Sequence, residues 1–209
     1  MVTKKAVPCK RPYSLGKRLE QSDQKRTKVL MALRKQLEAK GFSSLTLDGL
    51  AADSGVTRQT IYNLFSTKIG LLEALFDQIA IEGGMERMRN VMQAADAASM
   101  LAGFVEIFSG FWAKDRLLIR RAHGIAAIDP ELGAVVETRN QRRKLAATRV
   151  VEMLDQRNGG HAAGREQRIA VLYSLTSFEF FDALAEGCGS TEEAARLLPE
   201  IVNKALPSR

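Results

Sequence analysis

The sequence has few of the residues on which catalytic, metal-binding and disulfide-stabilised proteins depend. Its 209 residues include two cysteines, Cys9 and Cys188, and two isolated histidines, His123 and His161. Two cysteines cannot build a disulfide framework or a structural zinc site, and they fit a reducing cytoplasm. No nucleophile–base pair, Gly-rich phosphate loop or metal-ligand spacing is visible. We therefore expect neither an enzyme nor a cofactor.

Long apolar runs are also missing. The longest stretch without a charged residue, Ile169–Phe178, has ten residues, whereas a bilayer-spanning helix needs roughly 20. The basic N-terminus is not followed by an apolar run, so we expect no secretory signal. Hydrophobic residues make up 45% of the chain and charged residues 26%, a balance that favours a folded core over disorder.

Positive charge is concentrated at one end of the chain. The formal net charge is +7, but residues 1–70 hold fourteen basic and five acidic side chains, a balance of +9 that leaves −2 for the rest. Nucleic acid is the leading candidate partner for such a basic segment. Charge alone explains a solvated basic tail equally well.

Residues 1–24 are rich in Lys, Arg, Pro and Ser and have no apolar periodicity, so they are predicted to form a flexible basic arm. Two interpretations of this arm remain open: it contacts the minor groove of DNA, or it is a tail that contacts nothing.

Residues 25–40 predict a helix that ends at Gly41, with Phe42 folding back on Leu37. Its apolar face comprises Val29, Leu30, Leu33 and Leu37.

Capping residues mark the next three helices. Thr46 is placed to cap a helix that reaches Ser54, and Thr57 to cap a short helix at 58–65. A fourth helix starts after Ser66 or Thr67 and ends near Gly83-Gly84.

The remaining chain shows no alternating strand pattern. It predicts helices at about 96–113, 115–127, 130–157, 165–186 and 191–206, hence an all-α fold of about nine helices. Asp129-Pro130-Glu131 and the capping box Ser190–Glu193 mark two of the starts. Pro199 predicts that the last helix is kinked or split.

Leu47–Ser66 has the pattern of a helix-turn-helix. Ala51 is small where two helices approach closely, and Gly55 allows the positive φ that the turn requires. Four apolar residues would seal the pair against the preceding helix: Leu50, Val56, Ile61 and Leu64. The outward residues of the second helix are polar or amphipathic and suit DNA contact: Thr57, Arg58, Gln59, Thr60, Tyr62 and Asn63.

Gly41-Phe42, the run Thr46–Lys68 and Leu71-Leu72 together resemble the signature of the TetR family of transcriptional regulators. The resemblance covers about a quarter of the chain. It implies a helix-turn-helix DNA-binding domain of three helices at 25–70 and a helical effector-binding and dimerisation domain at 71–209. The helix that begins near Lys68 would connect the DNA contact to the effector pocket.

The resemblance also implies roles for single residues. Thr46 and Lys68 match phosphate contacts, 57–60 match the turn that reads base edges, and Tyr62 matches a tyrosine that packs on the DNA backbone. The DNA-contact set is therefore Thr46, Thr57, Arg58, Gln59, Thr60, Tyr62, Asn63 and Lys68. Each of two assignments has an alternative that involves no DNA. Tyr62 could be a ring in the protein core, and Lys68 could be a solvated surface residue.

Three positions depart from the family pattern. Leu64 replaces a histidine that lies near phosphate in many members, and Gln59 replaces a common glycine, which adds a side chain able to bond adenine or phosphate. Gly49 weakens its helix by roughly 1 kcal/mol relative to alanine.

By resemblance, the protein is a homodimer on a near-palindromic operator, joined through the last two long helices, at 165–186 and 191–206. Apolar residues at helical spacing on these helices are candidate contacts: Val171, Leu175, Phe178, Leu197, Leu198, Ile201, Val202, Ala205 and Leu206.

The effector pocket is expected among the middle helices. Its candidate lining is Phe104, Phe108, Phe111, Trp112, His123, Phe178 and Glu179. Aromatic residues at this spacing also suit an ordinary core. A partly buried Glu179 would favour a cationic ligand. The basic run Arg139, Arg142, Arg143 and Lys144 would favour an anionic one, unless it is a solvated helix face.

These observations predict a cytoplasmic repressor that an unidentified small-molecule effector releases from its operator. The alternative is a DNA-binding regulator or architectural protein without an effector.

Overall fold

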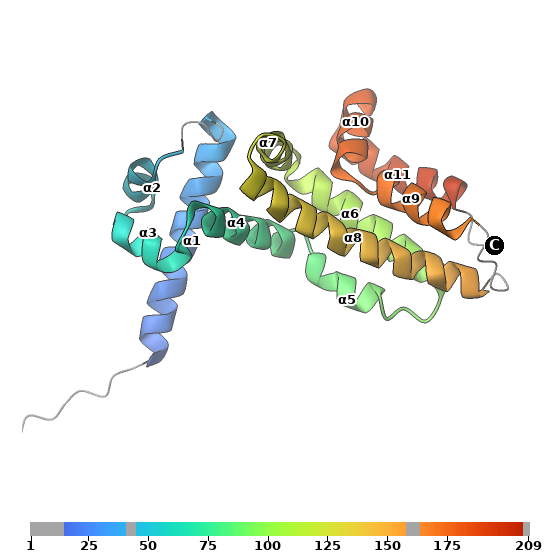
Figure 1. The fold of residues 1–209 in the computed structure, drawn as a ribbon, viewed down its shortest axis with the longest axis horizontal. Coiled ribbons are helices and arrows are strands. Elements are labelled where there is room, and N and C mark those ends of the chain that lie inside the picture. Colours follow the sequence, from blue (N-terminus) through green and yellow to red (C-terminus); the bar gives the residue numbers. More distant parts are fainter. Residues whose placement is uncertain (1–14, 41–44, 158–163, 207–209) are drawn as a thin grey trace, which may run out of the picture.

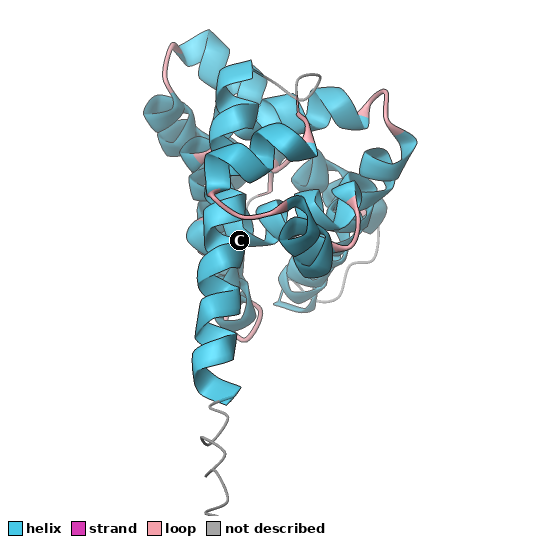
Figure 2. Cartoon of the chain, turned by 90° about the vertical axis from the view of Figure 1, so that its left-hand side faces the viewer, coloured by secondary structure: helices cyan, strands magenta, loops and turns pink. Residues whose placement is uncertain are grey.

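The computed structural model describes residues 15–40, 45–157 and 164–206. These residues form eleven α-helices and one short 3₁₀ helix, η1, and they contain no strand (Figures 1 and 2). The elements are α1 (Leu15–Lys40), α2 (Leu47–Ser54), α3 (Arg58–Phe65), α4 (Lys68–Glu82), η1 (Met85–Arg87), α5 (Met88–Val91), α6 (Ala97–Lys114), α7 (Arg116–Ala126), α8 (Pro130–Arg157), α9 (Arg165–Leu175), α10 (Phe178–Cys188) and α11 (Thr191–Ala205). The all-α prediction is confirmed.

Helix α1 begins ten residues earlier than predicted. It starts at Leu15, so residues 15–24 are helical rather than part of an arm. This stretch contains no proline and consists largely of good helix formers, so helical hydrogen bonding continues beyond the packed half of α1. The predictions for residues 1–14, Gly41, Phe42 and His161 lie outside the described residues.

The helix starts of the N-terminal region follow the predicted caps. Thr46 Oγ1 accepts the Gly49 N–H at 3.1 Å, and Thr57 Oγ1 accepts the Thr60 N–H at 3.2 Å. Thr67, rather than Ser66, caps α4. Each bond satisfies an N–H group that has no partner within the helix.

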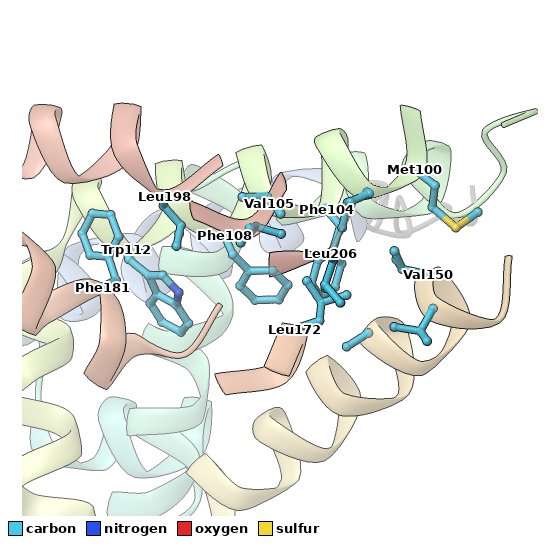
Figure 3. Packing of buried hydrophobic residues seen from close by; sticks show 14 of the residues in the cluster. Met100, Phe104, Val105, Phe108, Trp112, Val150, Leu172, Phe181, Leu198 and Leu206 are labelled. Atoms are coloured by element: carbon cyan, nitrogen blue, oxygen red, sulfur yellow. The ribbon is translucent and has the colours of Figure 1, made fainter. Parts of the chain in front are cut away.

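Two apolar clusters hold the fold together. The first joins α1–α4, where the predicted stripe of α1 is buried, and it extends to Leu118 of α7 and to Leu132 and Val135 of α8. The second joins α6 with α8–α11 around Phe104 and Phe181. Figure 3 shows its side chains pointing toward one another from these helices. Because the first cluster includes α7 and α8, the helices α1 and α4 that hold the helix-turn-helix are packed directly onto the rest of the chain.

The predicted helix at 165–186 is wrong, because the chain forms two helices there. Thr176 ends α9, and its buried hydroxyl donates to the Leu172 carbonyl at 2.7 Å. Ser177 is extended and caps α10 by accepting the Phe180 N–H at 3.1 Å. Threonine and serine make such local bonds to the backbone, which competes with helix continuation.

Two further details refine the prediction. Helix α11 continues through Pro199, which excludes the split and leaves the kink as a prediction. Two short elements, η1 and α5, precede α6 and were not predicted, because three or four residues are too few to show a periodic pattern. Among the described helices, none combines the length and apolarity needed to cross a membrane.

We predict that Gly55→Ala destabilises the protein by about 1 kcal/mol, because Gly55 has φ = +68° and a Cβ atom is unfavourable in that conformation. No atom lies within 4 Å of the added Cβ, so the cost comes from the backbone alone. Denaturant unfolding followed by circular dichroism measures the change.

Gly110→Ala is the matched control. Gly110 lies inside α6 with open space around its Cβ position, so alanine should stabilise the protein by roughly 0.5–1 kcal/mol. Equal effects of the two substitutions would contradict the conformational explanation.

Candidate DNA interface and ligand cavity

Helix α3 buries one face and exposes the other. Ile61 and Phe65 are buried against α1 and α4, whereas Tyr62 is 62% exposed. Tyr62 is therefore not a core ring. Of the predicted DNA-contact residues, Thr60 is half-buried and the others are exposed: Thr46, Thr57, Arg58, Gln59, Tyr62, Asn63 and Lys68.

The exposed polar side chains of α3 are held by local contacts. Arg58 pairs with Asp48 of α2 at 3.2 Å, and Gln59 Nε2 donates to Asn63 Oδ1 at 2.9 Å. Both ends of the Arg58–Asp48 pair are mostly exposed, so the ion pair is weak and its guanidinium can exchange Asp48 for a stronger anion.

Three helix N-termini lie in this region. Thr46, Thr57 and Lys68 stand at the starts of α2, α3 and α4, respectively. The N–H groups and dipole of a helix N-terminus favour anions such as phosphate. Exposed donors at successive helix starts therefore form a surface suited to a polyanion.

A cavity of about 300 Å³ lies between α4, η1, α5, α6, α7 and α8. Its apolar wall is formed by Phe76, Ile79, Ala80, Met85, Met88, Phe108, Phe111, Trp112, Ile119, Ala122, Val136 and Ala146. Its polar wall is formed by Asp77, His123, Arg139, Asn140, Arg142 and Arg143. Within the described ranges, His, Cys, Asp and Glu side chains form no group of three suited to a metal ion.

The cavity includes part of the predicted lining. Phe108, Phe111, Trp112 and His123 border it. Phe104 and Phe178 lie outside this lining, fully or almost fully buried in the second cluster. Phe104 packs edge-on against Phe108 at 5.0 Å between ring centroids, and Phe178 packs against Trp112 at 5.5 Å. Both rings therefore support the wall from behind.

Glu179 is not the partly buried carboxylate that was expected. Its side chain is 67% exposed, and Oε1 lies 2.8 Å from His123 Nδ1. This hydrogen bond lowers the pKa of the Glu179 carboxyl to about 2. As the first residue after Phe178 in α10, it points out of the core that the flanking phenylalanines occupy, so it offers no buried site for a cationic ligand.

The basic run on α8 is not a uniform solvated face. Arg142 and Lys144 are exposed, but Arg143 is only 5% exposed and Arg139 is half-buried. The burial of Arg143 could have been recognised from helical spacing, because Arg143 lies on the same helix face as the buried residues Ala147 and Val150.

Two arginines attach the N-terminal helices to the cavity region. Arg34 of α1 pairs with Glu82 at the end of α4 at 2.8 Å and with the buried Asp115 between α6 and α7. Arg121 of α7 donates to the carbonyl groups of Leu37 and Glu38 at the end of α1. These contacts and the shared apolar cluster connect the helix-turn-helix to the helices that surround the cavity.

Residues 29–75 match the family model described as bacterial regulatory proteins, tetR family. This N-terminal segment is therefore similar to the regulatory proteins of the TetR family. It is 32% identical over 129 residues to the HTH-type transcriptional regulator AlkX of Mycobacterium tuberculosis, an alignment of 59% of this chain. The chain spans 57% of the length of that relative.

Solved structures share the complete TetR-like fold. A TetR transcription regulator from Haloarcula marismortui has a TM-score of 0.70 at 15% identity, covering 88% of this chain and 97% of the other. A Saccharomonospora viridis protein solved in complex with choline has a TM-score of 0.66 at 16% identity, with coverages of 87% and 96%.

Replacing Arg34 with methionine is predicted to destabilise the protein by about 3 kcal/mol, because it leaves the Asp115 carboxylate, only 5% exposed, without its cationic partner. Thermal and denaturant unfolding measure this loss.

Arg196→Met is the control, since Arg196 pairs with Glu193 and Glu200 on the exposed surface of α11. Its unfolding midpoint should stay close to that of the wild type. If Arg34→Met were equally silent, the Arg34–Asp115 contact would not stabilise the junction.

Proposed function

We propose that this protein is a DNA-binding transcriptional repressor that a small-molecule effector releases from its operator. One observation carries the proposal: α4 starts at the candidate DNA surface with Lys68 and contributes Phe76, Asp77, Ile79 and Ala80 to the cavity wall. A ligand in the cavity therefore touches the same helix that borders the DNA-facing surface.

The exposed face of α3 supports DNA as the partner. A recognition helix enters the major groove with its N-terminal residues toward the base edges. Arg58 and Gln59 have the donors and acceptors for direct readout, Tyr62 extends from the same helix, and Lys68 supplies positive charge at the start of α4. The relative AlkX is named as an HTH-type transcriptional regulator, in keeping with this role.

Release follows from linkage between the two sites. If the effector prefers an α4 position that misplaces α3 on DNA, it lowers operator affinity by the coupling free energy, typically about 1–3 kcal/mol. Arg139 of α8 pairs with Asp77 of α4 at 2.7 Å and lies over the Phe76 ring at 5.4 Å. This contact joins the cavity wall to α4, where a shift would begin.

We also propose a homodimer, with an interface narrower than the sequence indicated. Phe178, Leu198, Val202 and Leu206 are buried within the chain's own core, so they cannot be the exposed contacts that were expected. Leu197 and Ile201 are partly exposed and one turn apart on α11. A two-fold dimer through this face would place two α3 helices on one operator.

Selection of operators from random DNA tests the proposed function. Wild-type protein should enrich a near-palindromic sequence. Arg58→Ala should weaken binding by about 1–3 kcal/mol and relax the consensus, since it removes a base-reading donor. Tyr62→Phe should have a smaller effect, because only a hydroxyl is lost.

Arg149→Ala serves as the control for this experiment, because Arg149 is an exposed residue of α8 outside the helix-turn-helix. The assignment of the DNA surface is wrong if Arg58→Ala and Tyr62→Phe both retain full affinity and the same consensus.

The dimer prediction is tested by light scattering after gel filtration. Ile201→Glu should shift the protein toward the monomer, because it places a charge in an apolar contact. Asn203→Glu adds the same charge at an exposed position of α11 and should leave the dimer intact. An unchanged mass for both variants would place the interface elsewhere.

A further inference from the structure

The cavity wall contains a buried cation that the proposed function does not yet use. Arg143 of α8 borders the cavity and is 5% exposed. Burial lowers the pKa of its guanidinium below the usual value, since a charge is less stable away from water. Arginine nevertheless stays protonated in proteins, so the wall holds a positive charge.

All the hydrogen-bond partners of Arg143 in the described structure are neutral. Nη1 donates to the Tyr173 carbonyl and to Thr176 Oγ1 at 3.4 Å, and Nη2 donates to Asn140 Oδ1 at 3.4 Å. The guanidinium also lies 4.0 Å from the Tyr173 ring centroid. No carboxylate of the described residues forms an ion pair with Arg143, and its Nε is buried without a hydrogen-bond partner in that part of the chain.

The neighbouring acids already have partners. Asp77 Oδ1 accepts from Arg139 Nη2 at 2.7 Å, and Glu179 bonds to His123 at 2.8 Å. The lining therefore contains three guanidinium groups, those of Arg139, Arg142 and Arg143, and one carboxylate, that of Asp77. This excess of positive charge favours an anionic ligand.

The rest of the wall sets the shape and polarity of the ligand. Aromatic and methionine side chains dominate it, with Phe111 and Trp112 in contact at 4.7 Å between ring centroids. A volume of about 300 Å³ corresponds to roughly ten water molecules at about 30 Å³ each, so it accepts on the order of ten non-hydrogen atoms. Methionine side chains adapt to different apolar shapes.

We propose that the cavity binds a monocarboxylate with an apolar body of on the order of ten non-hydrogen atoms, and that the Arg143 guanidinium at the cavity wall supplies the positive charge that its carboxylate requires. The inference rests on the proposed function in one respect, that this ligand is the effector. The carboxylate supplies the anion that the buried guanidinium lacks, and the aromatic wall covers the alkyl or aryl body.

A matched ligand series tests the charge requirement in the absence of DNA. Octanoate, octanamide and octylammonium share an eight-carbon body but carry a negative, zero and positive charge. Trp112 is the only tryptophan in the chain and borders the cavity, so its fluorescence reports binding. We expect octanoate to bind at least about tenfold more tightly than octanamide, and octylammonium and choline not to bind detectably.

A pair of variants tests the assignment to Arg143. Arg143→Gln should remove the preference of the protein for octanoate over octanamide. Lys144→Gln removes the same charge from the adjacent exposed position of α8 and should keep the preference. Circular dichroism confirms that the variants fold. If Arg143→Gln does not fold, the wild-type ligand series tests the charge requirement, and Arg143→Lys, which keeps the charge, should keep the preference for octanoate.

The outcomes separate this inference from the proposed function. Equal affinity for octanoate and octanamide, preference for octylammonium or choline, or no binding of any probe would overturn the carboxylate assignment and leave operator selection unaffected. Octanoate binding that depends on Arg143, in a protein that selects no operator, would support the cavity assignment and overturn the proposed repressor. Octanoate binding without a change in operator affinity would remove its role as effector.

Discussion

The packing of α4 between the two parts of the molecule is the constraint on which the remaining arrangement depends. Leu71, Leu75 and Ile79 are buried against α1 and its neighbours, while Phe76 and Asp77 border the cavity. Figure 1 shows α4 between the helix-turn-helix and the larger helical region. A helix held by an apolar core on one face cannot adjust at the cavity without moving its partners, so α4 connects the cavity mechanically to the helix-turn-helix.

Charged side chains add ion pairs and hydrogen bonds to the apolar contacts between the N-terminal helices and the rest of the molecule. Arg34 meets the buried Asp115 and the end of α4, and Arg121 holds the last carbonyls of α1. Buried charges of this kind contribute little net stability compared with apolar packing, but their loss is costly once the core has formed around them. These contacts tie the N-terminal helices to α6 and α7.

Local signals in the sequence were sufficient for much of the fold. The apolar stripe of α1 and the caps Thr46, Thr57 and Thr67 were recognisable because each acts within one turn of helix. The break at Thr176-Ser177 was missed because a continuous apolar pattern outweighed a serine cap. Only the tertiary structure places Trp112 Nε1 where it donates to the Thr176 carbonyl at the end of α9, at 3.0 Å.

Of the two candidate sites, the sequence could predict the DNA-facing residues but not the lining of the cavity. The outward face of α3 could be predicted from its sequence, because the burial of Ile61 leaves Arg58 and Tyr62 exposed by helix geometry alone. For the cavity, the aromatic residues of α6 did not reveal which rings line the space: Phe108 does, while Phe104 lies behind it.

The sequence by itself determined the all-helical fold, the helix-turn-helix and its outward residues, since these depend on spacing along one helix and on caps within a turn. Only the tertiary structure decided that Leu198 and Val202 belong to the core, that Glu179 faces outward, and that Arg143 is buried at the cavity. The physical reason is that burial depends on which helices pack against a residue, and charge or hydrophobicity alone does not specify the neighbour.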